Sequence, residues 1–179
     1  MTKVVRQVET TRQSSADALE CAFAQYQGEL LGTLYYLVGN MEDAHDALQD
    51  AFIKCWRHQD QVPEVKNLKA WIFRVVLNTG RDLRQTAWSR KRQSLPEDES
   101  MLESGTRGPE SVALQNEQIE RLRGAIKMLR EEEQEVFLLR QNGQLKYEEI
   151  AATIGIPLGT VKTRMRLALA RLRQTLALE

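Results

Sequence analysis

The sequence predicts an all-α protein made of two small helical domains joined by a flexible acidic linker. Apolar residues recur in steps of three and four along most of the 179-residue chain, which is the period of an amphipathic helix. Sustained apolar–polar alternation and Asn-Gly hairpin turns are missing from the sequence, so no strand is expected. One stretch in the middle of the chain is rich in Pro, Gly, Ser and acids, and it divides the two halves.

Composition and patterning argue against a membrane or secreted protein. No apolar stretch approaches the roughly 20 residues that span a bilayer, and the N-terminus lacks the apolar core of a secretory signal. The chain is therefore expected to be soluble and cytoplasmic, with no membrane insertion. Its two cysteines, Cys21 and Cys55, stand far apart within helical patterns, which favours two buried small side chains in a reducing compartment over a disulfide or a metal site.

Residue patterns that carry catalysis or metal binding are also missing from the sequence. His45 and His58 have no partners at ligand spacing, and there is no Gly-rich phosphate loop, Gly-x-Ser-x-Gly elbow or His-Glu-x-x-His helix. We therefore expect no catalytic residues, no metal and no cofactor. The chain is predicted not to be an enzyme.

The first domain is expected over residues 16–92, after an N-terminal tail of residues 1–15. Its first helix is predicted over Ala16–Val38, where apolar residues form one stripe. A capping-box pattern that begins at Ser14 marks the predicted start of this helix, and Gly39 marks its end.

Two asparagines are expected to cap the next two helices of this domain. Asn40 precedes a helix predicted over Met41–His58, with acids in its first turn. A loop that contains Pro63 follows, and Asn67 then precedes a helix predicted over Leu68 to about Arg90. Three amphipathic helices of this kind can share one core.

The second half begins with a predicted linker, residues 93–110, and a second domain, residues 111–179. The linker composition is that of an extended or disordered segment. Helices are predicted over Ser111–Met128, with Ile119 on the buried stripe, and over Glu131–Asn142, which we expect to end in a left-handed turn at Gly143.

The last part of the chain has the pattern of a helix-turn-helix. A short helix is predicted over Tyr147–Ile154, Gly155 permits a sharp turn, and Ile156 can fill the angle between two helices. Pro157 suits the start of a second helix from Leu158 onward. In such motifs the first turns of the second helix enter the DNA major groove, and here those turns carry Thr160, Lys162, Thr163, Arg164 and Arg166.

Charge is segregated although the formal net charge is zero. Residues 81–92 hold five bases and one acid, and residues 160–179 hold five bases and one acid. Acids dominate residues 93–110 and the run Glu131–Glu135. Because screening limits electrostatic attraction to about 8–10 Å, local charge decides what each surface binds, and two separate basic faces are predicted.

Each basic segment also fits a solvent-exposed helix that does not contact DNA. The C-terminal pair of helices fits a surface hairpin with solvated Lys and Arg, but the spacing of Ala151, Gly155 and Val161 favours the helix-turn-helix. The run over residues 81–92, taken alone, fits a solvated helix end equally well.

Three blocks of sequence resemble the extracytoplasmic-function (ECF) sigma factors, group IV of the sigma-70 family, which are initiation subunits of bacterial RNA polymerase. Gly39–Phe52, followed by Trp56, is similar to the region 2.2 helix of that family. Trp71–Asn78 resembles the start of its promoter-melting segment, and Ile156–Arg164 matches its region 4 recognition helix. The blocks occur in the family's order and cover nearly the whole chain apart from the ends and the linker.

The resemblance implies two partners, the polymerase core and promoter DNA. Residues 16–92 would be region 2, which docks on the clamp helices of the β′ subunit through Asp46, Gln49 and Asp50. An acidic patch suits a basic coiled coil electrostatically. Residues 111–179 would be region 4, which contacts the β flap and reads the upstream −35 box through the five recognition-helix residues named above.

Region 2 of the family also melts the −10 box and holds an unstacked base. The positions that match here are Lys66, Asn67, Arg74, Asn78, Arg81 and Arg84. One departure concerns the recognition helix, which often continues with Arg-Ala-Arg in the family but reads Leu167-Ala168-Leu169 here. A phosphate or base contact is therefore expected to be missing at that point.

The predicted function is that of an alternative sigma factor that directs the polymerase core to specific promoters. The resemblance also implies a stress response and control by an anti-sigma factor. One alternative is an autonomous helix-turn-helix transcriptional regulator that uses the first domain for dimerisation or sensing. Another is an adaptor without DNA contact, which leaves the recognition-helix pattern unexplained.

Overall fold

The structure, a computed structural model, describes the backbone of residues 2–93 and 110–177 and the side chains of residues 13–86 and 117–177. Within the described backbone the chain forms α-helices and one 3₁₀ helix, and no strand, as predicted. The predicted linker falls almost wholly on residues 94–109, outside the described part. None of the described helices is long and apolar enough to cross a membrane.

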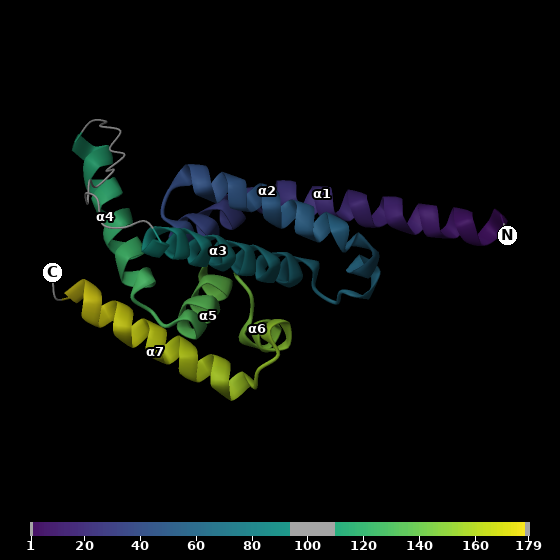
Figure 1. The fold of residues 1–179 in the computed structure, drawn as a ribbon. Coiled ribbons are helices and arrows are strands. Elements are labelled where there is room, and N and C mark those ends of the chain that lie inside the picture. The colour runs from purple at the N-terminus through teal and green to yellow at the C-terminus, as the bar shows by residue number, and fades with distance from the viewer. Residues whose placement is uncertain (1, 94–109, 178–179) are drawn as a thin grey trace.

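Three long helices and a 3₁₀ turn build the first bundle (Figure 1): α1 (Thr2–Val38), α2 (Met41–Arg57), η1 (Gln59–Glu64) and α3 (Leu68–Gln93). Each of the three long helices packs on the other two. Their buried stripes meet in a core that includes Leu30, Leu34, Phe73 and Leu77. Gly80 allows α1 and α3 to approach closely, because a Cβ there would lie 2.8 Å from Leu37 Cδ1.

Both predicted asparagine caps are confirmed. Asn40 Oδ1 accepts a hydrogen bond of 2.8 Å from the backbone N–H of Asp43, which supplies a partner to the first turn of α2. Asn67 Oδ1 accepts one of 3.0 Å from the N–H of Ala70 at the start of α3.

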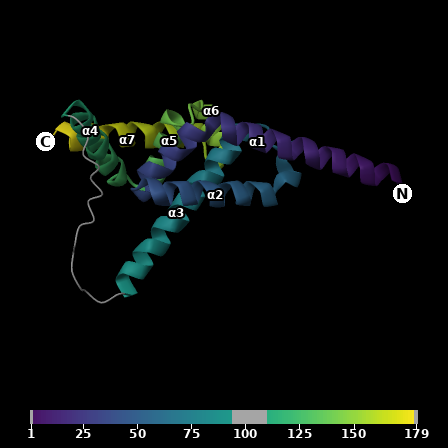
Figure 2. The ribbon, with the colours of Figure 1, turned by 90° about the horizontal axis from the view of Figure 1, so that it is seen from above.

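Three predictions for the first half are wrong. α1 continues N-terminally past Ser14 to Thr2, because no Gly or Pro interrupts the helix there, and this end projects beyond the bundle (Figures 1 and 2). The loop after α2 is largely the 3₁₀ helix η1. Cys55 is fully buried as expected, but Cys21 lies on the exposed side of α1.

Four helices build the second bundle: α4 (Glu110–Lys127), α5 (Glu131–Gln141), α6 (Tyr147–Ile154) and α7 (Leu158–Ala177). Its core includes Ile126, Leu138, Ile150 and Val161, all at most 1% exposed. Ile119, predicted to face inward, is 43% exposed, since it lies on the side of α4 away from this core.

The turn after α5 differs from the prediction at one position. The left-handed residue is Gln144, with φ of 52°, and not Gly143. Glycine is nevertheless required at position 143, because a Cβ there would lie 2.6 Å from the carbonyl oxygen of Leu139. The need is for close backbone approach and not for a positive φ.

The second bundle packs against one side of the first. α3 lies against α5 and α6, and α1 lies against the end of α4 (Figure 1). Seen from above, the C-terminal end of α3 projects away from the other helices (Figure 2).

Candidate nucleic-acid interface

The turn between α6 and α7 has the predicted helix-turn-helix geometry. Gly155 takes the left-handed conformation with φ of 71°, and its N–H donates to the carbonyl oxygen of Ala151 over 3.0 Å. The N–H of Ile156 donates to the same oxygen over 3.1 Å, and its side chain is half-buried in the angle between the helices. α6 therefore fixes the direction in which α7 leaves the turn.

The five recognition-helix residues lie in the first turns of α7. Lys162, Thr163 and Arg166 are exposed, and Thr160 and Arg164 are half-buried. The opposite side of these turns carries core residues such as Val161 and Met165, so the polar set faces outward. Leu167 is one of the positions that depart from the family pattern, and it is 39% exposed. An apolar side chain therefore lies on the surface where the family often has an arginine.

An acidic and apolar stripe runs along the outer side of α2. Asp46, Gln49 and Asp50 are all exposed there, in steps of three and one. Ile53, 45% exposed, and Trp56, 36% exposed, continue the stripe by the same helical spacing. Ile53 was missed by the sequence analysis, although its spacing from Asp46 and Asp50 places it on their side of the helix.

The six residues predicted for the −10 box are spread along α3 and the residues before it. Lys66 and Asn78 are exposed. Asn67 caps α3 through Oδ1, and its Nδ2 donates to Glu149 Oε1 of α6 over 3.1 Å. The guanidinium of Arg74 donates to the carbonyl oxygen of Thr153, also in α6. Asn67 and Arg74 therefore reach across to α6 of the second bundle.

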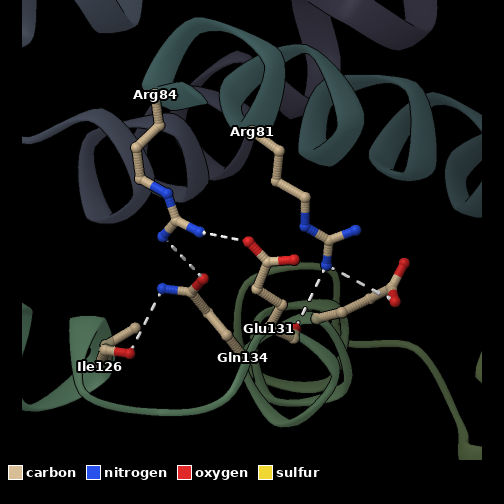
Figure 3. Close-up of polar contacts among 6 residues, drawn as sticks. Arg81, Arg84, Ile126, Glu131 and Gln134 are labelled. Carbon is tan, nitrogen blue, oxygen red and sulfur yellow. Dashed lines mark hydrogen bonds and ion pairs between the residues drawn. The ribbon is translucent and has the colours of Figure 1, made fainter. Parts of the chain in front are cut away.

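Arg81 and Arg84 are held by the N-terminal half of α5 (Figure 3). Arg84 pairs with the carboxylate of Glu131 over 3.0 Å, and its second terminal nitrogen donates to Gln134 Oε1 over 3.4 Å. Arg81 pairs with Glu135 over 3.5 Å and donates to the backbone carbonyl of Glu131 over 3.3 Å. The Arg81 side chain is only 17% exposed, and its Nε is buried without a partner.

A second link joins the end of α1 to α4. Arg123 donates to the backbone carbonyl of Gly39 and to the hydroxyl of Tyr35, and it pairs with Glu120 over 2.9 Å. Burial, with a hydrogen bond to Glu120, raises the pKa of Tyr35. Burial, with the nearby charge of Arg123, lowers the pKa of Lys127.

The sequence analysis did not identify Glu131, Gln134 and Glu135 of α5 as the partners of Arg81 and Arg84. The acidic run over residues 131–135 was evident in the sequence, but the arginines that it contacts were not.

Within the described side chains, no group of three or more His, Cys, Asp or Glu gathers closely enough to hold a metal ion.

Comparisons with known proteins match one family region to each of the two helical bundles. The family model described as Sigma-70 region 2 matches residues 22–90, and the one described as Sigma-70, region 4 matches residues 119–172. The RNA polymerase sigma-E factor of Streptomyces coelicolor is 32% identical over 155 residues, 84% of this chain and 81% of that protein. The ECF RNA polymerase sigma factor SigE of Mycolicibacterium smegmatis is 30% identical over 154 residues, 86% of this chain but 59% of that longer protein.

Two solved structures share the fold. CnrH, in complex with the cytosolic domain of CnrY, superposes with a TM-score of 0.67 at 19% identity and covers 96% of each chain. The sigma factor RpoE of Bartonella quintana, in complex with the anti-sigma factor NepR, gives a TM-score of 0.63 at 23% identity, over 89% of this chain and 97% of that one.

Proposed function

This chain belongs to the extracytoplasmic-function group of the sigma-70 family, and from that membership we propose how its surfaces divide the work of starting transcription. Sigma factors bind the RNA polymerase core and promoter DNA, and they are not themselves enzymes. The observation that carries the function is the presence, in one chain, of region 2 over residues 22–90 and region 4 over residues 119–172. The alternative function, an autonomous helix-turn-helix regulator, does not account for the presence of region 2.

The first proposal assigns the −35 box to α7. Thr160, Lys162, Thr163, Arg164 and Arg166 are the residues we propose to contact it. This proposal is supported by their shared position on the outward side of the first turns of α7, a helix that α6 holds at a fixed angle. Arg164 can bind a guanine edge with two hydrogen bonds, and Lys162 and Arg166 are suited to phosphates.

The second proposal assigns the polymerase core to α2. Asp46, Gln49 and Asp50 supply charge that suits a basic coiled coil, as the β′ clamp helices would present. Ile53 and Trp56 extend this surface with apolar area, which supplies affinity that charge alone does not. A contact between region 4 and the β flap belongs to the same proposal.

The third proposal assigns the −10 box to α3 and the residues before it. Lys66 and Asn78 are exposed and available to a DNA strand, whereas Asn67, Arg74, Arg81 and Arg84 contact the second bundle. Binding of −10 DNA by all six residues therefore requires α5 and α6 to move away from α3.

An anti-sigma factor is the proposed regulator, acting in a stress response. Two solved structures with the same fold hold a bound partner: CnrH with the cytosolic domain of CnrY, and the sigma factor RpoE with the anti-sigma factor NepR. We propose a comparable partner for this chain, and its cytoplasmic location follows from the polymerase it serves.

Reconstituted transcription tests the function directly. Purified chain mixed with RNA polymerase core should give run-off transcripts from specific promoters, and sequencing transcripts made on genomic DNA would define those promoters. Transcription indistinguishable from that of core alone would refute the proposal. A tight, sequence-specific complex with duplex DNA in the absence of polymerase would favour the autonomous regulator.

A further inference from the structure

We propose that Leu167 contacts the methyl group of a thymine in the upstream promoter box. The inference rests on the proposed binding of the −35 box by α7. It adds a specificity-determining residue to that surface and names the base feature that this residue recognises. Leu167 is the tenth residue of α7 and is 39% exposed, although its side chain is apolar.

Leu167 lies in one row with three of the residues proposed to bind the −35 box. It follows Thr160 by seven positions, Thr163 by four and Arg164 by three, and residues at these spacings share one side of a helix. The next residue, Ala168, is fully buried, and the row of four faces away from the core on which Ala168 packs. This row therefore presents two hydroxyl groups, one guanidinium group and, at its end, an apolar side chain.

The cations near Leu167 do not replace the arginine that is frequent in the family at its position. Arg171 continues the row four positions later, but its Nε lies 3.1 Å from the buried carboxylate of Glu133, so its guanidinium group is held toward α5. Lys162 and Arg166 are four positions apart and form a separate row on a neighbouring side of α7. At Leu167 the row thus offers apolar surface without a cation of its own.

The thymine methyl group is the feature of the major groove that suits such a side chain. Leucine has no donor or acceptor for a phosphate or for the polar atoms of a base edge, whereas the C5-methyl of thymine is an apolar group that protein side chains contact in the groove. The seven positions from Thr160 to Leu167 rise about 10 Å along α7, which is comparable with about three base-pair steps. Leu167 and Thr160 can therefore reach the same box.

A second exposed leucine on the same helix provides a matched control. Leu176 is 38% exposed, almost the same as Leu167. It follows Leu167 by nine positions, about two and a half turns, so it lies on the opposite side of α7 from the row. The two leucines differ in their position relative to the row and not in residue type or exposure.

Uracil substitution in the DNA tests the contact without a change in the protein, because uracil is thymine without the C5-methyl group. The probes are promoter duplexes recognised by the reconstituted holoenzyme, in which each thymine of either strand of the upstream box is replaced singly by uracil. Their affinities are measured by competition in fluorescence anisotropy for holoenzymes that carry the unsubstituted chain, Leu167→Ala or Leu176→Ala.

We expect uracil at one position to lower the affinity of the unsubstituted holoenzyme about three- to fivefold, the loss that corresponds to one buried methyl group. The same uracil should have no effect with Leu167→Ala and its full effect with Leu176→Ala, since changes to two groups in contact are not additive. Leu167→Arg should abolish the uracil effect and make the salt dependence of affinity steeper by about one counterion.

Several outcomes would overturn the contact. These are an upstream box without thymine, uracil substitutions that leave the affinity of the unsubstituted holoenzyme unchanged, and a uracil effect that persists in full with Leu167→Ala. Leu167→Ala that weakens binding equally to thymine and uracil duplexes would place the leucine against the polymerase instead. Failure of the proposed function is distinguishable, because the unsubstituted holoenzyme would then make no promoter-directed transcripts on unmodified DNA.

Discussion

An ion pair between Glu133 and Arg171 ties α5 to α7 and so helps to hold the recognition helix. Glu133 Oε2 lies 3.1 Å from Arg171 Nε, with 3% of the Glu133 side chain and 41% of the Arg171 side chain exposed. The same carboxylate oxygen accepts a hydrogen bond of 3.3 Å from the backbone N–H of Arg130. The two partners thus differ greatly in their access to water.

This difference predicts an asymmetry between the two single substitutions. Arg171→Ala leaves a buried carboxylate without its cation, and we expect it to cost about 2–3 kcal/mol, below the range for fully buried pairs because Arg171 reaches water. Glu133→Gln leaves a half-exposed arginine that water can solvate and keeps an acceptor for Arg130, so we expect a cost of about 1 kcal/mol.

Urea denaturation followed by fluorescence and by circular dichroism can distinguish the unfolding of the two domains. All three tryptophans, Trp56, Trp71 and Trp88, lie in the first half of the chain, so their fluorescence reports that half, whereas far-UV circular dichroism reports both. Arg171→Ala should shift the circular-dichroism transition with little change in fluorescence. Arg173→Ala, an exposed position on the same helix, is the matched control. A cost for Glu133→Gln equal to or above that for Arg171→Ala would refute the reasoning.

Four further predictions concern other parts of the molecule. Arg164→Ala should weaken −35 binding by the reconstituted holoenzyme by about 1–3 kcal/mol and relax preference at one base pair, measured with a set of promoter variants. Asp50→Lys should reduce affinity for the polymerase core about tenfold in a fluorescence-anisotropy titration, since it places a cation opposite a basic surface, and unchanged affinity would remove α2 from that interface. Gly80→Ala should lower stability by about 1–3 kcal/mol in thermal denaturation, because its Cβ would lie 2.8 Å from a buried leucine methyl of α1. Near neutral pH a thiol reagent should modify Cys21 and leave Cys55 intact until the chain unfolds, because burial raises the pKa of the Cys55 thiol to about 12; rapid modification of two thiols in the folded chain would contradict this.

Features fixed by neighbouring residues were predictable from the sequence. The caps at Asn40 and Asn67 and the sharp turn at Gly155 each depend on a few adjacent positions, and the structure has all three. The same kind of signal failed at Ser14, because a residue that suits a cap is also tolerated inside a helix when nothing stops the preceding turns. The positive φ lies on Gln144, whereas the neighbouring Gly143 is needed for its small size.

Contacts between the bundles were not predictable in the same way. The basic run at Arg81 and Arg84 and the acids at Glu131 and Glu135 were both evident as charge. Charge along a sequence carries no information about distance, however, and about 50 residues separate the partners. The surface proposed for DNA could therefore be identified from its residue types, but its contact with α5 could be found only in the folded chain.

Asn67 and Glu149 each serve a helix start and the contact between the two bundles at once. Asn67 uses its amide oxygen to start α3 and its amide nitrogen to reach Glu149. Glu149 uses one carboxylate oxygen for Asn67 and the other for the backbone N–H of Lys146 at the start of α6. Breaking the single bond between these two side chains would leave each helix with its own terminal hydrogen bond, so loss of this contact would not by itself unwind the start of α3 or of α6.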